Sequence, residues 1–181
     1  DASKALRLPG VKAVLTGEDT PKILWGQIYQ EHYILAVGKV RFIGEEVASI
    51  VATDADAAGE ALGLIRVDYE PLAAVLEPEE AMKPDAPQVH EGQSNIVRDI
   101  RIDRGDIDAG FAAAHVVHED TYETPYQYQA YVEPAGSMAA GDSSGGVTVW
   151  SSTQTIYFQK EVVAQALGLP QSKVRVIQPF V

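Results

Sequence analysis

The 181-residue sequence contains no cysteine. Disulfides, cysteine-based zinc fingers and thiolate-held iron–sulfur clusters are therefore excluded within this chain. If the protein takes part in redox chemistry, its electron-carrying clusters must lie in another chain or segment.

Long apolar runs are missing as well. No run approaches the roughly 18 consecutive apolar residues that a membrane-spanning helix needs. No signal peptide opens the chain, although Asp1 is not a natural start residue and a leader could precede it. We therefore expect no association with a membrane and a cytoplasmic location.

Basic residues are few. Lysine and arginine number 14 against 26 acidic residues, which gives a formal net charge of −12. A surface with this charge repels phosphate backbones, so nucleic acid is not an expected partner. The hydrophobic share of 46% is that of an ordinary globular protein, and the length suffices for one core or two small ones.

Common catalytic and metal-binding motifs are also absent. No G-x-G-x-x-G, Walker or G-x-S-x-G motif occurs, so no catalytic residue is predicted. His115 and His118 are three residues apart on a predicted strand, where they point to opposite faces. The acidic residues around Gly105 lack the spacing and the terminal glutamate of a calcium loop. The sequence therefore predicts no metal ligand.

The N-terminal part, residues 1–77, has the pattern of a small α/β unit. Apolar strands are predicted at residues 11–15 and 47–52. Thr53 is the predicted cap of a helix, with Asp56 in the capping-box position and apolar residues at helical spacing beyond it. The sequence therefore predicts a strand, a second strand and a helix in this order.

Two further segments follow that helix. Residues 65–70 alternate between apolar and polar side chains, which predicts a half-buried strand that ends at Pro71. Residues 78–94 hold three prolines among acidic and small residues, and we interpret them as a linker with one helical turn near residues 79–82. A domain boundary is expected here.

The C-terminal part, residues 95–181, mixes strands and helices. A helix is predicted from Asp106 or Ile107 to Ala114, and another between Gln154 and the stop at Gly168. The expected strands lie at residues 95–102, 116–122, 147–150 and 173–177.

Several phrases of the sequence occur in the order found in one known family. They are the opening PGVKAVLT, the strand–helix–strand pattern that ends in YEPL, the phrase GDIDAGFAAAHVVHEDTYETP, and the last third from Thr121 to Val181. Together they resemble the large, molybdenum-binding subunit of the xanthine dehydrogenase, aldehyde oxidase and carbon monoxide dehydrogenase family. The chain departs from the family at Glu46, where proline is common, and lacks the strand that usually precedes the opening.

The resemblance implies an α+β fold in two lobes. Residues 1–77 would form the α/β hammerhead domain without its first strand, residues 78–94 a linker, and residues 95–181 the N-terminal part of the molybdopterin-binding domain. In the family a glycine-rich loop of the GGGFG type would follow directly after Val181. The resemblance thus identifies the chain as a fragment of such a subunit.

The implied activity is that of a molybdenum hydroxylase, an oxidoreductase acting on aldehyde, heteroaromatic or aromatic acyl-CoA substrates through a molybdopterin cofactor. Iron–sulfur clusters and FAD would reside in partner chains or segments. Since the glycine loop and the family's active-site glutamate lie outside the chain, we expect the 181 residues alone to be inactive and to bind no cofactor.

Two other interpretations stay open. The chain could be a stand-alone, non-catalytic interaction module that docks an iron–sulfur electron-transfer subunit, or a structural domain without a ligand. Unpaired strand edges at its ends would also allow a homodimer.

The resemblance also points to two cofactor-binding residues. Gln127 matches, counting back from Glu133, the glutamine beside the oxo ligand of the molybdenum, and its amide can donate a hydrogen bond to such an oxygen. Gln129 is the alternative if the register slips, and an exposed strand glutamine is the plain structural interpretation. Gln154 follows a strand and opens a helix, where ligands often bind in α/β folds. The competing role for that junction is helix capping by Ser152, Thr153 or Thr155.

Overall fold

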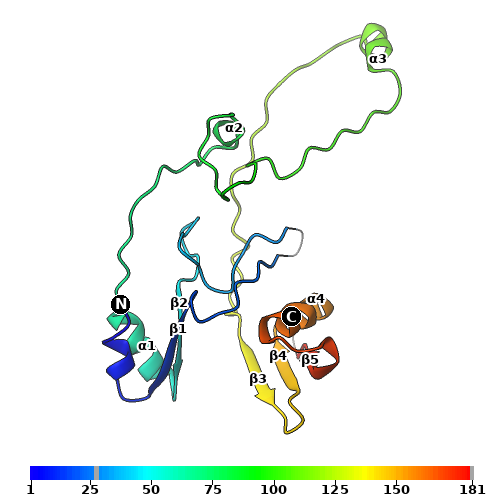
Figure 1. Ribbon diagram of the computed structural model, residues 1–181. Coiled ribbons are helices and arrows are strands. Elements are labelled where there is room, and N and C mark those ends of the chain that lie inside the picture. The colour runs from blue at the N-terminus through cyan, green and yellow to red at the C-terminus, as the bar shows by residue number, and fades with distance from the viewer. Residues whose placement is uncertain (27–28, 180–181) are drawn as a thin grey trace.

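A computed structural model of the chain describes residues 1–26 and 29–179. It contains helices and two separate sheets, one of two strands and one of three, so the predicted α+β class is confirmed. Figure 1 shows both sheets in the lower half of the view. Residues 96–136, called the excursion, form a long loop that extends away from the sheets and carries α3 (Figure 1). Among the described residues, no helix combines the length and apolar character that membrane crossing requires.

The N-terminal sheet pairs β1 (Val11–Thr16) with β2 (Ala48–Ala52) in antiparallel register, with an irregularity between Val11 and Ala13. The short helix η1 (Ala5–Arg7) and helix α1 (Ala55–Leu64) pack against these strands. Ala5 and Ala61 are fully buried between them. Both strands and the helix agree with the prediction from sequence.

The start of α1 corrects the predicted cap. Asp54, and not Thr53, caps the helix: its carboxylate accepts a hydrogen bond from the Ala57 N–H at 2.9 Å. The Thr53 hydroxyl donates to Asp54 at 2.9 Å, and its backbone N–H donates to the Gly10 carbonyl at 2.9 Å. Gly10 has φ +95°, and a Cβ atom on it would lie 2.9 Å from the Thr53 hydroxyl oxygen. The backbone N–H of Thr53 is therefore bonded to the turn before β1 and its hydroxyl to Asp54, and Thr53 does not cap α1.

Three predicted strands do not form, which makes those predictions wrong. Residues 65–70, 95–102 and 116–122 run without ladder partners among the described residues. Their alternating side chains fit a strand, but a strand needs a neighbour to satisfy its backbone. In the first segment, the Ile65 N–H closes helix α1 by donating to the Leu62 carbonyl at 3.3 Å. The N–H and C=O of Arg66 bond the backbone of Asp1 at 3.0 and 2.6 Å.

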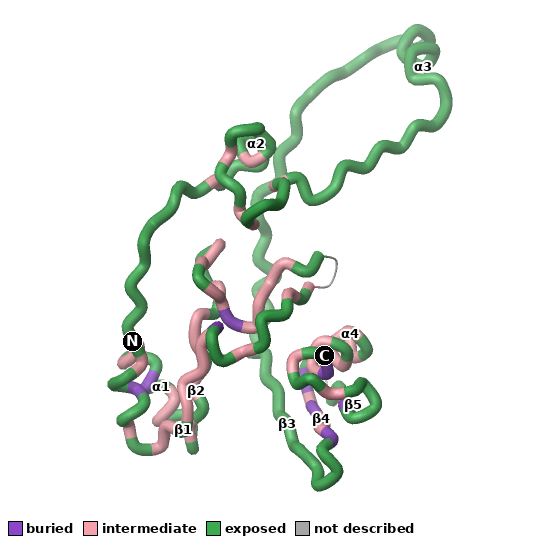
Figure 2. Tube along the Cα trace, viewed as in Figure 1, coloured by how far each residue is buried: buried purple, intermediate pink, exposed green. Residues whose placement is uncertain are grey.

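The middle of the chain contains two short helices, α2 (Pro78–Ala81) and α3 (Ile107–Ala113). The loop around α2 is tied together by Asn95, whose amide donates to the carbonyls of Ala81 and Pro87 at 3.0 Å each. Helix α3 is capped by Asp106, which agrees with the predicted start at Asp106 or Ile107, and lies at the far end of the excursion (Figure 1). Figure 2 shows residues 96–136, which include α3, exposed throughout, whereas the loop around α2 is partly covered.

The C-terminal sheet has the order β3-β4-β5, formed by β3 (Ser137–Gly141), β4 (Val147–Ser151) and β5 (Val174–Ile177). β3 is antiparallel to β4, whereas β4 and β5 are parallel. Helix α4 (Ile156–Leu167) and the short helix η2 (Gln171–Lys173) connect the parallel strands. The small core between this sheet and α4 consists of Val149, Ala164 and Val174.

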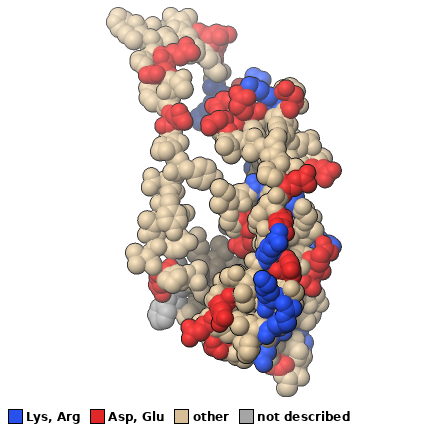
Figure 3. All heavy atoms as spheres, turned by 90° about the vertical axis from the view of Figure 1, so that its left-hand side faces the viewer, with Lys and Arg blue, Asp and Glu red and all other residues tan. Residues whose placement is uncertain are grey.

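Charge is distributed unevenly over the surface. Figure 3 shows lysine and arginine side chains gathered in the lower half of the view, over the N-terminal helices and strands. Acidic side chains are spread more widely and reach the upper part of the molecule (Figure 3). The excess negative charge of the sequence therefore does not extend evenly over every face.

Candidate functional site

One edge of the C-terminal sheet brings together three chain segments. Because β4 and β5 are parallel, their carboxyl ends lie at the same edge, with Trp150 opposite Ile177. β3 is antiparallel, so its first residue, Ser137, pairs with the last residue of β4, Ser151. Ligands in α/β folds bind outside the carboxyl ends of strands, which makes this edge the candidate site.

Gln154 lies at this edge, in the turn of residues 152–155 that joins β4 to α4. Its side chain is exposed. The turn is shaped by local hydrogen bonds: the Thr153 N–H donates to the Ser151 carbonyl at 3.0 Å, and the Thr155 N–H donates to the Thr153 hydroxyl oxygen at 3.2 Å. The structure thus places Gln154 at the strand-to-helix junction that the sequence predicted.

The amino end of α4 carries no side-chain cap. Thr155 occupies the N-cap position, and its side chain accepts no hydrogen bond from the helix. Its hydroxyl instead lies 3.4 Å from that of Thr153. Within the described residues, the first backbone N–H groups of α4 therefore receive no cap from Thr155 at the same edge that presents Gln154.

Gln127 lies in the extended segment that leads into β3 from this edge. Its side chain is exposed, and its Nε2 group donates to the Tyr128 carbonyl at 3.4 Å. The neighbouring Gln129 is also exposed. The rings of Tyr128 and Tyr131 lie 5.8 Å apart, and Ala130 between them has φ +56°. This segment is therefore locally bent, and its glutamines face solvent in the chain itself.

The opposite end of the sheet is held by a turn with a structural role. Asp142 accepts hydrogen bonds from the Ser144 hydroxyl at 2.7 Å and from the N–H groups of Ser144 and Gly146. The Ser144 hydroxyl and then these N–H groups lower the pKa of the Asp142 carboxyl. Lys173, just before β5, donates to the Ser144 carbonyl at 2.8 Å.

Nothing in the sequence indicated a polar contact that lies next to the turn of residues 152–155. The Ser151 hydroxyl oxygen accepts hydrogen bonds from the Ser137 hydroxyl at 2.9 Å and from the Gln159 amide at 3.2 Å. Ser151 is 6% exposed and is the one buried polar residue found among the described residues. No motif marks these residues, because they meet only after β3 pairs with β4.

A second cluster lies around Glu31, far from the sheet edge in sequence. The carboxylate oxygens of Glu31 lie 3.4 Å from His32 Nε2 and 3.8 Å from His90 Nε2. The His32 ring packs edge-on against Phe42, with the ring centroids 5.9 Å apart. No group of three or more histidine, aspartate or glutamate residues in the described part of the chain is arranged to hold a metal ion.

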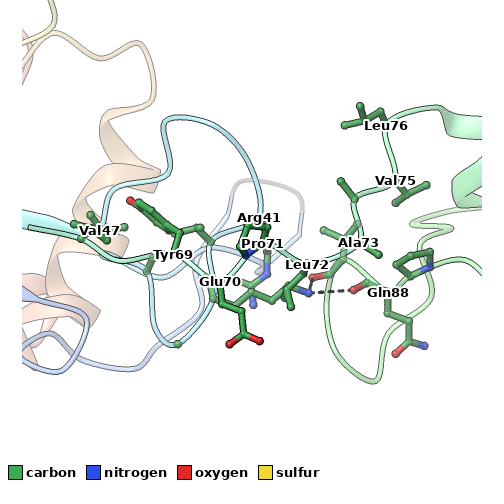
Figure 4. A pocket seen from close by; sticks show the side chains of 18 of the residues that line it. Arg41, Val47, Tyr69, Glu70, Pro71, Leu72, Ala73, Val75, Leu76 and Gln88 are labelled. Carbon is green, nitrogen blue, oxygen red and sulfur yellow. Dashed lines mark hydrogen bonds between the residues drawn. The ribbon is translucent and has the colours of Figure 1, made fainter.

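A groove of about 890 Å³ lies between the loop of residues 36–47 and the segment of residues 67–76. Figure 4 shows Tyr69, Pro71 and Leu72 beside Arg41 in this groove. Lys39 closes it by donating to the carbonyls of Gln88 and Val89 at 3.3 and 3.5 Å. Neither candidate glutamine lines the groove, so it is separate from the sheet edge.

Comparisons with known proteins match both parts of the chain. The molybdopterin cofactor-binding domain family matches residues 89–181, which is just over half of the chain. The a/b hammerhead domain of aldehyde oxidase and xanthine dehydrogenase matches residues 1–73. Both matches agree with the resemblance inferred from sequence phrases.

Individual relatives are similar over nearly the whole chain. The nicotinate dehydrogenase large molybdopterin subunit of Eubacterium barkeri is 37% identical over 179 residues, which cover 98% of this chain and 42% of the relative. The carbon monoxide dehydrogenase large chain of Afipia carboxidovorans is 35% identical, with 99% of this chain and 24% of the relative covered. The chain thus spans less than half of the length of these relatives.

The fold is also that of solved structures. The aldehyde oxidoreductase from Desulfovibrio desulfuricans superposes with a TM-score of 0.88 at 28% sequence identity. This superposition covers 98% of this chain and 21% of the aldehyde oxidoreductase chain. The fold of this chain therefore corresponds to one part of a larger chain.

Proposed function

Because this chain belongs to the aldehyde oxidase and xanthine dehydrogenase family of molybdopterin-dependent oxidoreductases, we propose that the β4–α4 edge supplies one wall of a molybdopterin site. The supporting observation is the position of Gln154. It stands at the carboxyl end of a parallel strand pair, inside the region that matches the molybdopterin-binding family model. The remaining walls would come from segments that the longer relatives possess.

The donor set at this edge fits an anionic, oxygen-rich cofactor. Gln154 offers a neutral amide, Ser152 a hydroxyl and α4 its uncapped first N–H groups. Such groups donate hydrogen bonds without competing for protons, and a helix amino end favours negative charge. When bound, the molybdenum cofactor supplies the Lewis acid and accepts electrons. The residues of this chain would orient it and hold hydrogen bonds to its oxygens.

Gln127 is proposed as a second contact to the cofactor. The segment that carries it enters β3 at the same edge, because Ser137 pairs with Ser151. Its exposed amide would need to be ordered by the cofactor or by further protein segments. Gln154 is the stronger candidate, since it is anchored by a strand on one side and a helix on the other.

The substrate and partners follow from the family. We propose an aldehyde, heteroaromatic or aromatic acyl-CoA substrate, oxidised or reduced in the whole protein. The absence of cysteine places iron–sulfur clusters elsewhere, so electrons would pass to iron–sulfur and flavin chains or segments. A cytoplasmic location fits such a complex.

A docking role is the second proposal, and the exposed excursion favours it. Ile102, Val116, Tyr122 and Val132 are 76 to 97% exposed on a segment with few backbone partners. Exposed apolar side chains in such number mark a surface that another protein segment covers. A stand-alone module of this kind would bind an iron–sulfur subunit and no cofactor, which a pull-down with that subunit would detect.

Substitution of the two glutamines tests the cofactor proposal. In the gene product that carries these residues, Gln154→Ala should lower turnover by about tenfold or more, the effect expected for a lost contact near a metal group. Gln127→Ala should lower turnover less, and Gln165→Ala, at an exposed position near the carboxyl end of α4, serves as the matched control. Unchanged turnover and unchanged molybdenum content in Gln154→Ala would contradict the role of this residue.

A further inference from the structure

Three polar side chains, those of Ser137, Ser151 and Gln159, are hydrogen-bonded to one another beside the β4–α4 turn. Ser137 and Ser151 are register partners on β3 and β4, and Gln159 lies in the first turn of α4. The Ser151 hydroxyl oxygen accepts from both of the others, at 2.9 and 3.2 Å. The contact therefore ties together all three elements that border the turn.

Helix geometry explains why Gln159 can make this contact. Helical side chains tilt toward the amino end of their helix, so a residue in the first turn reaches back toward the preceding strand. The backbone of Gln159 is fixed by its hydrogen bond to the Thr155 carbonyl at 2.9 Å. The bond from Gln159 to Ser151 thus spans the turn that contains Gln154.

The stability of the core does not account for a glutamine here. The Gln159 Oε1 atom is buried and has no hydrogen-bond partner within the described residues. An unsatisfied buried polar atom costs stability, and an apolar side chain of similar size avoids that cost. Within the described residues, the side-chain hydrogen bond of Gln159 to Ser151 offsets part of that cost and ties α4 to β4.

We propose that Ser151 and Gln159 are positioning residues that hold both ends of the turn presenting Gln154. Without their contact, the remaining hydrogen bonds of the turn within the described residues are short-range ones among Ser151, Thr153 and Thr155 and the helical bond from the Gln159 N–H to the Thr155 carbonyl. A loose turn would have to be ordered each time a ligand binds, which weakens binding. The inference rests on the proposed cofactor role of Gln154 for its functional meaning, whereas its geometry concerns this chain alone.

Amide hydrogen exchange in the chain, followed by NMR, tests the geometry. Gln159→Leu keeps the side-chain volume and removes the donor. Exchange of the hydrogen-bonded Thr153 and Thr155 amides should become about fivefold faster, as expected for one lost hydrogen bond, with the amides of β4 unaffected. The control Val174→Ala, in the buried core, should instead accelerate amide exchange throughout the C-terminal sheet.

Two results would overturn the proposal. One is unchanged exchange at Thr153 and Thr155 in Gln159→Leu. The other is an acceleration shared equally by β4, β5 and α4, because that indicates a general loss of stability. If Gln159→Leu does not fold, Ser151→Ala replaces it in the same comparison and is judged by the same criteria.

A double-substitution cycle tests the functional part in the cofactor-bearing gene product. Gln159→Leu should lower turnover in the parent protein and have no further effect when Gln154→Ala is already present. Additive losses would show that Gln159 does not act through Gln154. If Gln154→Ala alone changes nothing, the proposed cofactor role fails, while the exchange result still decides whether the turn is held by Gln159.

Discussion

At the level of single residues, cap and stop positions follow sequence rules closely. Helix α3 starts at Ile107 after its cap Asp106, and α4 ends at Gly168, in agreement with the predicted start at Asp106 or Ile107 and the predicted stop at Gly168. The cap of α1 was predicted one residue too early, because the hydrogen bonds of Thr53 to Gly10 and Asp54 arise only in the folded turn. The sequence therefore predicts where helices start and stop, but it does not predict which of two neighbouring side chains caps the helix.

Gly168 allows a direct test of such local chemistry. It has φ +63°, and the Leu169 N–H bonds the Ala164 carbonyl at 2.9 Å to close the helix. Gly168→Ala should lower the free energy of unfolding by about 1 kcal/mol, because alanine disfavours this conformation. Urea denaturation followed by circular dichroism measures the change.

The same substitution at Gly59 is the matched control. Gly59 lies inside α1, and a Cβ atom on it would meet nothing within 4 Å. Gly59→Ala should therefore raise the free energy of unfolding by up to about 1 kcal/mol. Equal effects of the two substitutions would contradict the assignment of Gly168 as a left-handed helix stop.

His90 gives a pH-dependent prediction. Burial, assisted by Arg41 and His32 and opposed by Glu31 and Glu45, lowers the pKa of His90 from its ordinary 6.5. Folding therefore favours neutral His90. Its contribution to stability is complete above pH 6.5 and is lost as the pH falls toward the lowered folded value.

His90→Gln should flatten this acid-side decline in the free energy of unfolding. Urea titrations at several pH values between about 7 and 5 measure it. His115→Gln, at an exposed position, is the control and should leave the decline as it is. A decline of the same size in His90→Gln and the parent chain would contradict the burial of this histidine.

At the level of elements, prediction succeeds where a strand finds its partner within the chain. Strands β1, β2, β4 and β5 were all expected from their apolar residues, and each has a ladder. β3 was missed because its sequence SMAAG is small and carries no strand signal. It forms because the tight turn at Asp142 returns the chain along β4.

The need for a partner also explains why three predicted strands do not form. Residues 116–122 were predicted to form a strand, yet no neighbouring strand lies beside them in the described structure. Sequence periodicity reports which side chains would face a core and says nothing about whether a partner is present. The candidate site shows this limit too, since the contact among Ser137, Ser151 and Gln159 depends on pairing.

Hydrogen exchange measured by mass spectrometry tests this picture of the elements. Peptides from residues 65–76 and 114–132 should exchange within the shortest labelling time, because their amides have few backbone partners. Peptides from β4 and α4 should be protected for much longer. Protection of residues 116–122 equal to that of β4 would show that they have a strand partner in solution.

At the level of the whole molecule, the chain exposes more apolar surface than a stable monomer keeps in water. Exposed isoleucine, valine and tyrosine side chains concentrate between residues 96 and 132, where no core forms (Figure 2). The chain also spans less than half of the relatives that it matches. Further protein, in the same molecule or in a partner, would cover this surface.

The chain by itself should therefore associate. Light scattering should give a mass above that of the monomer, and the mass should rise with salt, which screens the repulsion between chains of net charge −12. Replacing Ile102 and Val116 by serine should lower the mass, since both are largely exposed in the excursion. A monomer under all of these conditions would contradict an association driven by this segment.

The proposed place of these residues in a molybdopterin site is tested most directly by the molybdenum and pterin content of the gene product that carries them. This product would be purified from cells that make the cofactor and measured beside the 181-residue chain alone. We predict an equimolar amount of both in the gene product and none in the chain alone. A folded gene product without molybdenum or pterin, from cells whose other molybdenum enzymes are loaded, would contradict the claim and favour the docking role.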